Sequence, residues 1–375
     1  MTFLPSRYVA YFAPLVALAA AACHGSAASG PTIDLDTSRC EAQLQTLATF
    51  GGAPSQYATA HAIAAGADGT VYFDRREAGD GTGIYAIAHG QGDPVRISTF
   101  AFVDQLWVDG ATLLVASTGR LLSMPTSGGE PTLVSQIPPG PADPPPLVSS
   151  YVLAADGVYV GVGRGYAGNG GGSAEFDVYV LPRAGGDARL VAKTQDSAFQ
   201  YSWDATLQVD DANVYVIAGS GGGPVMSVPR AGGEFGTYVP HVEAGSPDNL
   251  TVVAGGVYTR GIAGDVQHYF LDAQAKTSSV APLDGKESSA TFLVGDGHAV
   301  YAGLLFGGTA ALRGGIAQIP VADETTPVLG CTAAASDPTQ QYVVNAMALD
   351  ASYVYGLGSN LSEQWAVWRV ARNPQ

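Results

Sequence analysis

Residues 151–193 read YVLAADGVYVGVGRGYAGNGGGSAEFDVYVLPRAGGDARLVAK, and this stretch predicts four short β-strands joined by tight turns. Asp156-Gly157 and Ala184-Gly185-Gly186 supply two of the turns, because glycine adopts the positive φ of hairpin turns without steric cost. Between the turns, β-branched and aromatic residues favour extended backbone. The expected strands are Tyr151–Ala155, Gly157–Val162, Phe176–Leu181 and Ala188–Lys193.

The same unit recurs along the chain with a period of about 43 residues and two longer gaps, which indicates a repeat fold. A Gly-Gly turn follows the third strand in three units, at Gly128-Gly129, Gly185-Gly186 and Gly232-Gly233. A Val-Tyr pair or a substitute marks the second strand of each unit, at Tyr72, Val115, Tyr159, Tyr215, Tyr258, Tyr301 and Tyr355. Units of this length with four strands are typical of β-propeller blades. The sequence therefore predicts an all-β, seven-bladed β-propeller of four-stranded blades.

The last unit contains three expected strands before Gln375. The run Leu44–Phe50, upstream of the first full unit, is predicted to supply the missing outer strand. Alternate residues of this run are apolar or small, although Leu47 falls on the opposite face. Closing the last blade with an N-terminal strand would leave no open edge in the ring.

The N-terminus predicts export. Met1–Ala22 carries one basic residue followed by an apolar stretch, as a secretory signal does. The run Leu18–Cys23 resembles a bacterial lipobox, in which the cysteine becomes the lipidated first residue of the mature protein; ordinary cleavage after Ala-x-Ala is the alternative. His24–Ser38 is rich in small and polar residues and is expected to be a flexible tether. The predicted division is therefore 1–22 signal peptide, 23–39 anchor and tether, and 40–375 propeller.

The composition excludes one class of partner. The formal net charge is −16, and charged residues make up 13% of the chain. Nucleic-acid binding requires a basic footprint, so we expect no nucleic-acid partner. Such a surface also repels anionic membranes, so membrane contact is expected only through the lipid anchor.

The repeated Val-Tyr, Val-Pro and Gly-Gly elements resemble those of bacterial extracytoplasmic propellers of the TolB-like and YncE-like kind, including uncharacterised lipoproteins with such repeats. The resemblance covers about Cys40 to Arg372 and implies the fold more strongly than the function, because propellers include enzymes as well as binding modules. The units lack the closing Trp-Asp dipeptide of WD40 repeats, an Asp-box run and a quinone-enzyme tryptophan repeat.

The loops between blades and the loops between second and third strands share one face of a propeller, where ligands usually bind. The loop Phe199–Asp204 is the richest of these, because Tyr201 and Trp203 could form a stacking platform with Asp204 beside them. The alternative is that these aromatic side chains pack between blades three and four.

Arginines also gather in the loops of this face, and Arg binds carboxylate or phosphate with a planar fork. They are Arg75, Arg76, Arg164, Arg260 and Arg313. Of these, Arg75, Arg164 and Arg260 join the aromatic loop as ligand-binding candidates. The alternative is that they are solvated residues that offset nearby acidic groups.

Cysteine and histidine give no local metal motif. No two histidines stand at the spacing of a zinc site, and Cys-x-x-Cys is missing from the sequence, so no metal or cofactor is expected. With Cys23 acylated, Cys40 and Cys331 remain, and an exported pair tends to oxidise. We predict a bridge between them at the rim of blades six and seven.

These observations favour a lipid-anchored, monomeric binding module of the cell envelope, at the outer membrane or facing the periplasm, with a secreted form as the alternative. The expected partner is an envelope protein or a glycan. A propeller enzyme, a lyase or hydrolase acting at the channel mouth, is the other hypothesis for function. A purely structural envelope protein is the third.

Overall fold

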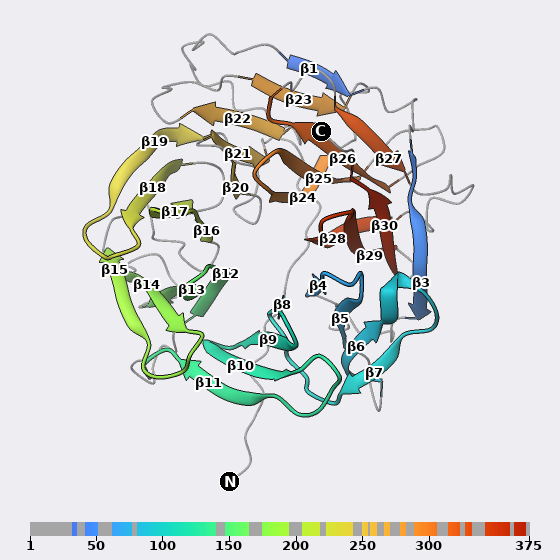
Figure 1. Cartoon of the computed structure of the whole chain (residues 1–375). Coiled ribbons are helices and arrows are strands. Elements are labelled where there is room, and N and C mark those ends of the chain that lie inside the picture. The colour runs from blue at the N-terminus through green and yellow to red at the C-terminus, as the bar shows by residue number, and fades with distance from the viewer. Residues whose placement is uncertain are drawn as a thin grey trace, which may run out of the picture.

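The computed structural model describes residues 32–35, 42–51, 62–76, 81–139, 147–164, 175–194, 205–217, 223–242, 250–253, 256–260, 266–270, 278–282, 289–305, 314–322, 327–331, 342–360 and 364–372. They form an all-β ring of seven blades, which confirms the predicted fold class (Figure 1). The one helix among these residues is the short 3-10 helix η1 (Ala88–Gly90).

The first four blades are consecutive in the sequence. Blade one contains β4 (Ile63–Ala65), β5 (Val71–Arg75), β6 (Gly83–Ile87) and β7 (Val95–Ser98). Blade two contains β8 (Gln105–Asp109), β9 (Thr112–Ser117), β10 (Arg120–Pro125) and β11 (Thr132–Gln136). Blade three contains β12 (Leu147–Leu153), β13 (Gly157–Arg164), β14 (Glu175–Pro182) and β15 (Arg189–Thr194). Blade four contains β16 (Thr206–Val209), β17 (Asn213–Ile217), β18 (Gly223–Pro229) and β19 (Gly236–Val242).

The last three blades include strands from the N-terminal part of the chain. Blade five contains β20 (Leu250–Val253), β21 (Gly256–Arg260), β22 (Val266–Phe270) and β23 (Ser278–Pro282), with β1 (Thr32–Leu35) added at its edge. Blade six contains β24 (Ser289–Gly295), β25 (Ala299–Leu305), β26 (Gly314–Pro320) and β27 (Val328–Cys331), with β2 (Ala42–Gln43) added. Blade seven contains β28 (Tyr342–Leu349), β29 (Tyr353–Asn360), β30 (Gln364–Ala371) and β3 (Gln45–Gly51).

Each blade places its first strand toward the centre of the ring and its fourth strand at the rim (Figure 1). Neighbouring strands within each blade are antiparallel, as hairpin connections require. The loops that join second to third strands therefore lie on the same face of the ring as the loops that lead into the next blade. The turns that join first to second strands lie on the opposite face.

The outer strand of blade seven is β3, which pairs antiparallel with β30 from Gln45↔Arg369 to Gly51↔Gln364. The strand predicted at Leu44–Phe50 is therefore present with its start shifted by one residue. A bulge between Thr46 and Ala48 accounts for the imperfect alternation, because the bulge lets both Leu47 and Ala48 contact the core between blades seven and one.

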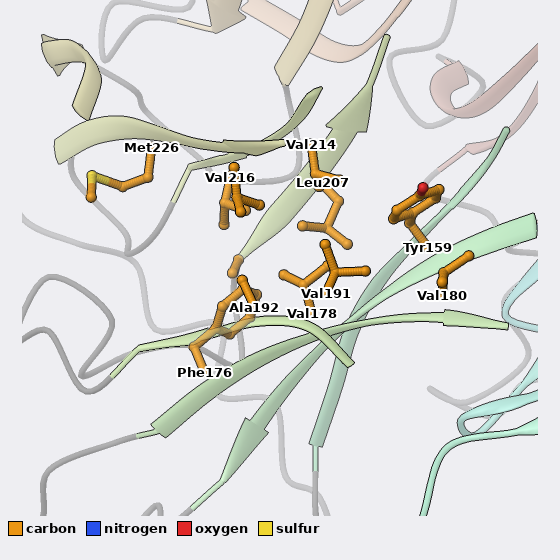
Figure 2. Packing of buried hydrophobic residues seen from close by; sticks show 12 residues of the cluster. Tyr159, Phe176, Val178, Val180, Val191, Ala192, Leu207, Val214, Val216 and Met226 are labelled. Carbon is orange, nitrogen blue, oxygen red and sulfur yellow. The ribbon is translucent and has the colours of Figure 1, made fainter. Parts of the chain in front are cut away.

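The hydrophobic core is divided into seven clusters, one between each pair of neighbouring blades. Between blades three and four, Tyr159, Phe176 and Val178 pack against Leu207 and Val216 of the next blade (Figure 2). Because each blade buries one face against each neighbour, the ring depends on all seven contacts and no blade has a complete core of its own.

The repeated tyrosines face the following blade, and blade two corrects one of the sequence markers. The residue equivalent to these tyrosines is Leu114, which packs between blades two and three. The expected marker, Val115, packs instead toward blade one. Side chains alternate along a strand, so an offset of one residue in the alignment reverses the face.

The structure differs from the prediction in the segment expected to be a tether. Thr32–Leu35 forms β1, which pairs parallel with β23 at the rim of blade five. The sequence Thr-Ile-Asp-Leu alternates apolar with polar residues, a pattern that favours a strand once an edge is there to pair with. The signal segment, Cys23 and Cys40 lie outside the described residues.

Candidate functional site

The predicted arginines lie at equivalent places in alternate blades. Arg75 ends β5, Arg164 ends β13 and Arg260 ends β21, so each stands at the end of a second strand on the same face of the ring. They do not come together, because a whole blade separates each from the next. The other candidates, Tyr201, Trp203, Asp204 and Arg313, lie outside the described residues.

Arg164 is bound within its own blade. Its Nε donates a hydrogen bond to Asp177 Oδ2 at 2.6 Å, and its Nη2 donates to the hydroxyl of Tyr179 at 3.2 Å. Tyr179 in turn donates to the same carboxylate oxygen at 3.1 Å. Strands β13 and β14 fix this arrangement, because Arg164 pairs with Glu175 and the side chains of Asp177 and Tyr179 share one face of β14. The guanidinium fork is thus largely occupied.

The Asp177 carboxylate is buried between blades, with 3% of its side chain exposed. Burial raises the pKa of this carboxyl above its ordinary value, and the hydrogen bonds from Arg164 and Tyr179 oppose the rise only in part. The second oxygen, Oδ1, has no hydrogen-bond partner. A carboxyl group held in this way is a candidate proton donor in the loop face of blade three.

Blade one uses its two arginines differently. The Arg75 guanidinium lies over the rings of Phe50 and Tyr85, with 4.9 and 5.5 Å from its carbon to the ring centroids. Arg76 Nε donates to Asp74 Oδ2 at 3.0 Å, and its Nη2 donates to the carbonyl of Val103 in the loop that enters blade two. Both arginines therefore contact neighbouring blades as well as their own.

Blade five repeats the arginine and tyrosine arrangement of blade three, with the neutral Gln267 at the position of Asp177. Arg260 is partly buried at the end of β21, and Tyr269 donates a hydrogen bond of 2.6 Å to Gln267 Oε1, as Tyr179 does to Asp177. His268, on the opposite face of β22, stacks on Tyr258 with 4.2 Å between the ring centroids. The replacement of Asp by Gln removes the charge from this position.

The loop from Thr99 to Asp104, which enters blade two, is the best-defined part of the ligand face. Glu130 accepts hydrogen bonds from the backbone and hydroxyl of Thr99 at one end. At the other end, the Asp104 carboxylate accepts from Thr118 N at 2.6 Å and from the Tyr151 hydroxyl at 3.1 Å.

Phe102 stands in the middle of this loop. Its side chain is 71% exposed and its backbone φ is +65°, a conformation that is unfavourable for a bulky residue. Hydrogen bonds at both ends of the loop hold the backbone that carries this exposed ring. This is the geometry of an aromatic anchor for a partner.

The opposite face carries a second group of ionisable residues, which the sequence analysis missed. Between blades three and four, Tyr159 donates to Asp156 Oδ2 at 2.9 Å, and Arg230 Nε donates to the Tyr159 hydroxyl at 3.1 Å. Arg230 Nη2 also donates to Asp156, and Nη1 donates to the Asp210 carbonyl of its own blade at 3.1 Å. One arginine thus joins the first turns of two blades.

The same three residue types recur between blades six and seven. Tyr301 donates to Asp296 Oδ2 at 3.1 Å, Arg372 Nε donates to the Tyr301 hydroxyl at 3.0 Å, and Arg372 Nη2 donates to Asp296. We call each set an Asp-Tyr-Arg triad. Because each triad lies at a blade contact and satisfies its own groups, its role is to hold the ring together.

Electrostatics support this structural role. Burial would raise the pKa values of Asp156 and Asp296, but their hydrogen bonds and the nearby arginines hold both below the ordinary value. The pKa values of Tyr159 and Tyr301 are raised, mainly by burial. All four groups therefore keep one charge state across the physiological pH range.

Among the residues with described side chains, no group of three or more His, Cys, Asp and Glu side chains is placed to hold a metal ion. In the same part of the chain, no helix has the length and apolar character needed to cross a membrane.

The sequence contained a signal for the buried carboxylates. Asp177 lies between Phe176 and Val178 in a strand that is otherwise apolar, and a buried charge requires a partner. The signal for the triads was an arginine directly after the third strand, at Arg230 and Arg372. The partners of these arginines belong to the preceding blade, so sequence spacing alone does not identify them.

Comparison with known proteins supports the fold. No family model and no curated protein matches the chain. Among solved structures, YCF48 bound to D1 peptide is similar with a TM-score of 0.53 and 12% identity, over 92% of this chain and 100% of that chain. The WD40 β-propeller domain of Doa1 is similar with a TM-score of 0.51 and 12% identity, over 87% of this chain and 96% of that one. The computationally designed Ika8 protein gives a TM-score of 0.51 and 13% identity, over 87% and 100%.

At such low identity these likenesses show the fold alone. Together with the seven antiparallel blades, they place the chain among the seven-bladed β-propellers, with WD40-like structural neighbours. This fold is typical of protein-interaction modules.

Proposed function

We propose that the protein is an exported, lipid-anchored propeller of the cell envelope that binds a protein or a glycan on the face formed by the second-to-third strand loops and the loops between blades. The observation that carries this proposal is the exposed Phe102 ring on a loop fixed at both ends. On the same face, Arg76 and Arg164 are paired with buried aspartates. An exposed aromatic ring beside arginines that are already paired within their own blade suits binding better than catalysis.

The structural neighbour YCF48 was solved with a bound peptide, and this fits a role in recognising a polypeptide. For this chain the nature of the partner is a proposal. The ligand surface would extend from Phe102 across blade two toward Arg164 and the loop that contains Tyr201, Trp203 and Asp204.

The alternative is a propeller enzyme acting on a glycan or a lactone. Asp177 supports it, because this buried carboxyl has a raised pKa and an unpaired oxygen. In this case Asp177 would donate a proton to the substrate. Loss of turnover in Asp177→Asn, with unchanged binding, would favour the enzyme.

The binding proposal can be tested with alanine at Trp203 and at Phe102. Capture from solubilised envelope by the immobilised chain, followed by quantitative mass spectrometry, should show the same partner weakened in both variants. Leu133→Ala is a matched control, because Leu133 is also exposed but lies on the outer strand of blade two. A large loss of stability in Trp203→Ala with unchanged capture would show that the aromatic side chain only packs between blades.

The proposed anchor rests on the apolar segment that ends at Cys23. Mass spectrometry of the mature N-terminus should find a lipid-modified Cys23. An unmodified N-terminal residue beyond this position would rule out the anchor and leave a secreted protein.

We also propose the bridge between Cys40 and Cys331. No disulfide is found among the residues that the structure describes, and Cys40 is not one of them. In support, Gln43 lies opposite Cys331 in the parallel pairing of β2 with β27, three residues after Cys40. A disulfide requires Cα atoms within about 7 Å, so the chain before Ala42 would have to turn back toward Cys331. Two free thiols in the denatured, unreduced mature protein would exclude the bridge.

A further inference from the structure

The Gly-Gly turns of three blades lie against the outer strand of the preceding blade. Gly129 N donates to the Ile97 carbonyl of β7 at 2.9 Å, and Gly233 N donates to the Val191 carbonyl of β15 at 3.3 Å. In the third case the hydroxyl of Ser135 in β11 donates to the Gly186 carbonyl at 2.8 Å. Two of the turns therefore bond to the backbone edge of the neighbouring outer strand, and the third bonds to a side chain of that strand.

Glycine is required in these turns for two reasons. Gly129 has a φ of +129° and Gly186 a φ of +109°, which other residues rarely adopt. A Cβ atom at Gly128 would also stand 2.8 Å from the Ile97 carbonyl oxygen, closer than atoms can approach. The repeated glycines thus allow each turn to cover the edge of its neighbour.

Four blades carry no Gly-Gly pair after the third strand in the sequence, and blades six and seven are two of them. The sequence that follows β26 is Val-Ala-Asp-Glu-Thr-Thr and contains no glycine. In blade seven no turn joins the third strand to the fourth, because its fourth strand is β3, from the other end of the sequence. The outer strands β23 and β27, which such turns would cover, contain no charged residue and so lack that common protection of an exposed edge.

The N-terminal segment pairs with these same two strands. β1 pairs parallel with β23 from Thr32↔Ser279 to Leu35↔Pro282, and β2 pairs parallel with β27 from Ala42↔Gly330 to Gln43↔Cys331. The segment then enters the core at Leu44, which is 4% exposed between blades six and seven, and continues as β3. β1, β2 and β3 thus lie at the edges of three consecutive blades, and Figure 1 labels β1 and β3 at the rim.

The three contacts differ in strength. β3 pairs with β30 in an antiparallel register from Gln45 to Gly51, and Leu44 is buried. β1 and β2 are short, and each backbone hydrogen bond contributes only a modest net stability. The segment before Leu44 can therefore leave the rim while β3 stays in place.

We infer that the segment that carries β1 and β2 is a detachable strap, and that β23 and β27, at the rims of blades five and six, form a strand-acceptor site for these two strands. A free strand edge binds an extended peptide through main-chain hydrogen bonds, so the site recognises backbone more than side chains.

One consequence rests on the proposed lipid anchor at Cys23. With the strap seated, about nine residues separate the anchor from Thr32 and reach about 30 Å. With the strap released, about 21 residues lead to Leu44 and reach about 70 Å. Seating of the strap therefore sets how far the ring stands from the membrane.

Hydrogen–deuterium exchange of the full chain tests the strap. The double substitution Ile33→Pro with Asp34→Pro removes the donors of β1, so amides of β23 should exchange about tenfold faster, with no change in β11 or β15. Ser26→Pro with Ala27→Pro, placed ahead of β1, is the matched control and should leave β23 protected. Unchanged exchange in the Ile33/Asp34 variant would overturn the inference.

A synthetic peptide of residues 30–43, with Cys40→Ser, tests the acceptor site in trans. Added to the Ile33/Asp34 variant, it should restore the protection of β23. No protection at millimolar peptide would overturn the acceptor site. If the protection of β23 amides in the unaltered chain rises with protein concentration, the segment of one copy is binding to the ring of another. This result would overturn binding of the segment to its own ring.

The distance effect is tested separately, by energy transfer between a labelled lipid vesicle and a dye on blade two of the lipidated chain. Transfer should fall in the Ile33/Asp34 variant and not in the Ser26/Ala27 control. Failure to find lipid on Cys23 would contradict the proposed anchor and leave the exchange results standing. Equal transfer in the two lipidated variants would contradict the distance effect alone.

Discussion

The contact between blades three and four and the contact between blades six and seven use the same triad, yet the two carboxylates differ in exposure. The Asp156 side chain is 46% exposed, whereas that of Asp296 is 18% exposed. The difference begins in the turn. Asp156 lies three residues before its tyrosine and Asp296 lies five before, so only Asp296 Oδ1 reaches back to its own turn, where it accepts from His298 N at 2.7 Å and from Ala299 N at 2.8 Å.

The comparison shows that turn length, and not the identity of the three side chains, sets how firmly a triad is held. Asp296 is fixed by its own backbone before Arg372 binds it, so less side-chain freedom is lost when the ion pair forms. The better-held triad stands where blade seven, which contains strands from both ends of the sequence, meets blade six.

The largest loss of stability is expected when Arg372 is replaced. Arg372→Ala should lower the free energy of unfolding by about 2–3 kcal/mol, because it removes charge-assisted hydrogen bonds to Tyr301 and Asp296 and leaves a largely buried carboxylate without its counter-ion. Urea denaturation measures the change. Arg372→Lys keeps the charge without the planar fork and should fall between the alanine variant and the natural chain.

The second prediction concerns how the stability of the protein changes at acid pH. The pKa of Asp296 is lower in the folded protein than in the unfolded chain, so its stabilisation is present at neutral pH and is lost as pH falls below about 4. The unfolding free energies of the natural chain and of Asp296→Asn should therefore differ most at pH 7, and the difference should shrink as pH falls below about 4. A constant difference across this range would show that the carboxylate charge contributes nothing.

The smallest effect is expected at Arg230. Arg230→Ala should cost about 1 kcal/mol, since Asp156 is solvated and exposed pairs contribute little. The loss should also shrink in high salt more than the loss at Arg372 does. Equal losses at the two positions would show that the turn geometry does not matter.

Much of the fold was predictable because the repeat is local. The Val-Tyr strands and the Gly-Gly turns carry their own conformational preferences, so their spacing gave the blade count. The exceptions arise from tertiary contacts. Leu47 breaks the alternation because of a bulge, and Thr32–Leu35 becomes a strand only because an outer edge is left uncovered beside it.

The candidate binding residues were less predictable than the fold. Arg164 was expected to meet a ligand, and it binds Asp177 and Tyr179 in its own blade. Nothing in the spacing of these residues shows that the guanidinium turns inward. Phe102 was missed because an apolar residue in a short loop is normally assigned to the core. Only the structure shows that its side chain is exposed and that its backbone φ is positive.

The pairing of β3 with β30 also determines how the ring bears mechanical force. A pull on the N-terminal segment passes through β3 and acts along the strand, from Gln45↔Arg369 to Gly51↔Gln364. Antiparallel hydrogen bonds stand perpendicular to the strands, so they resist this shear together and do not open one at a time. Once β1 and β2 have left the rims of blades five and six, blade seven therefore carries the tension before blades one to four, which follow it in the sequence.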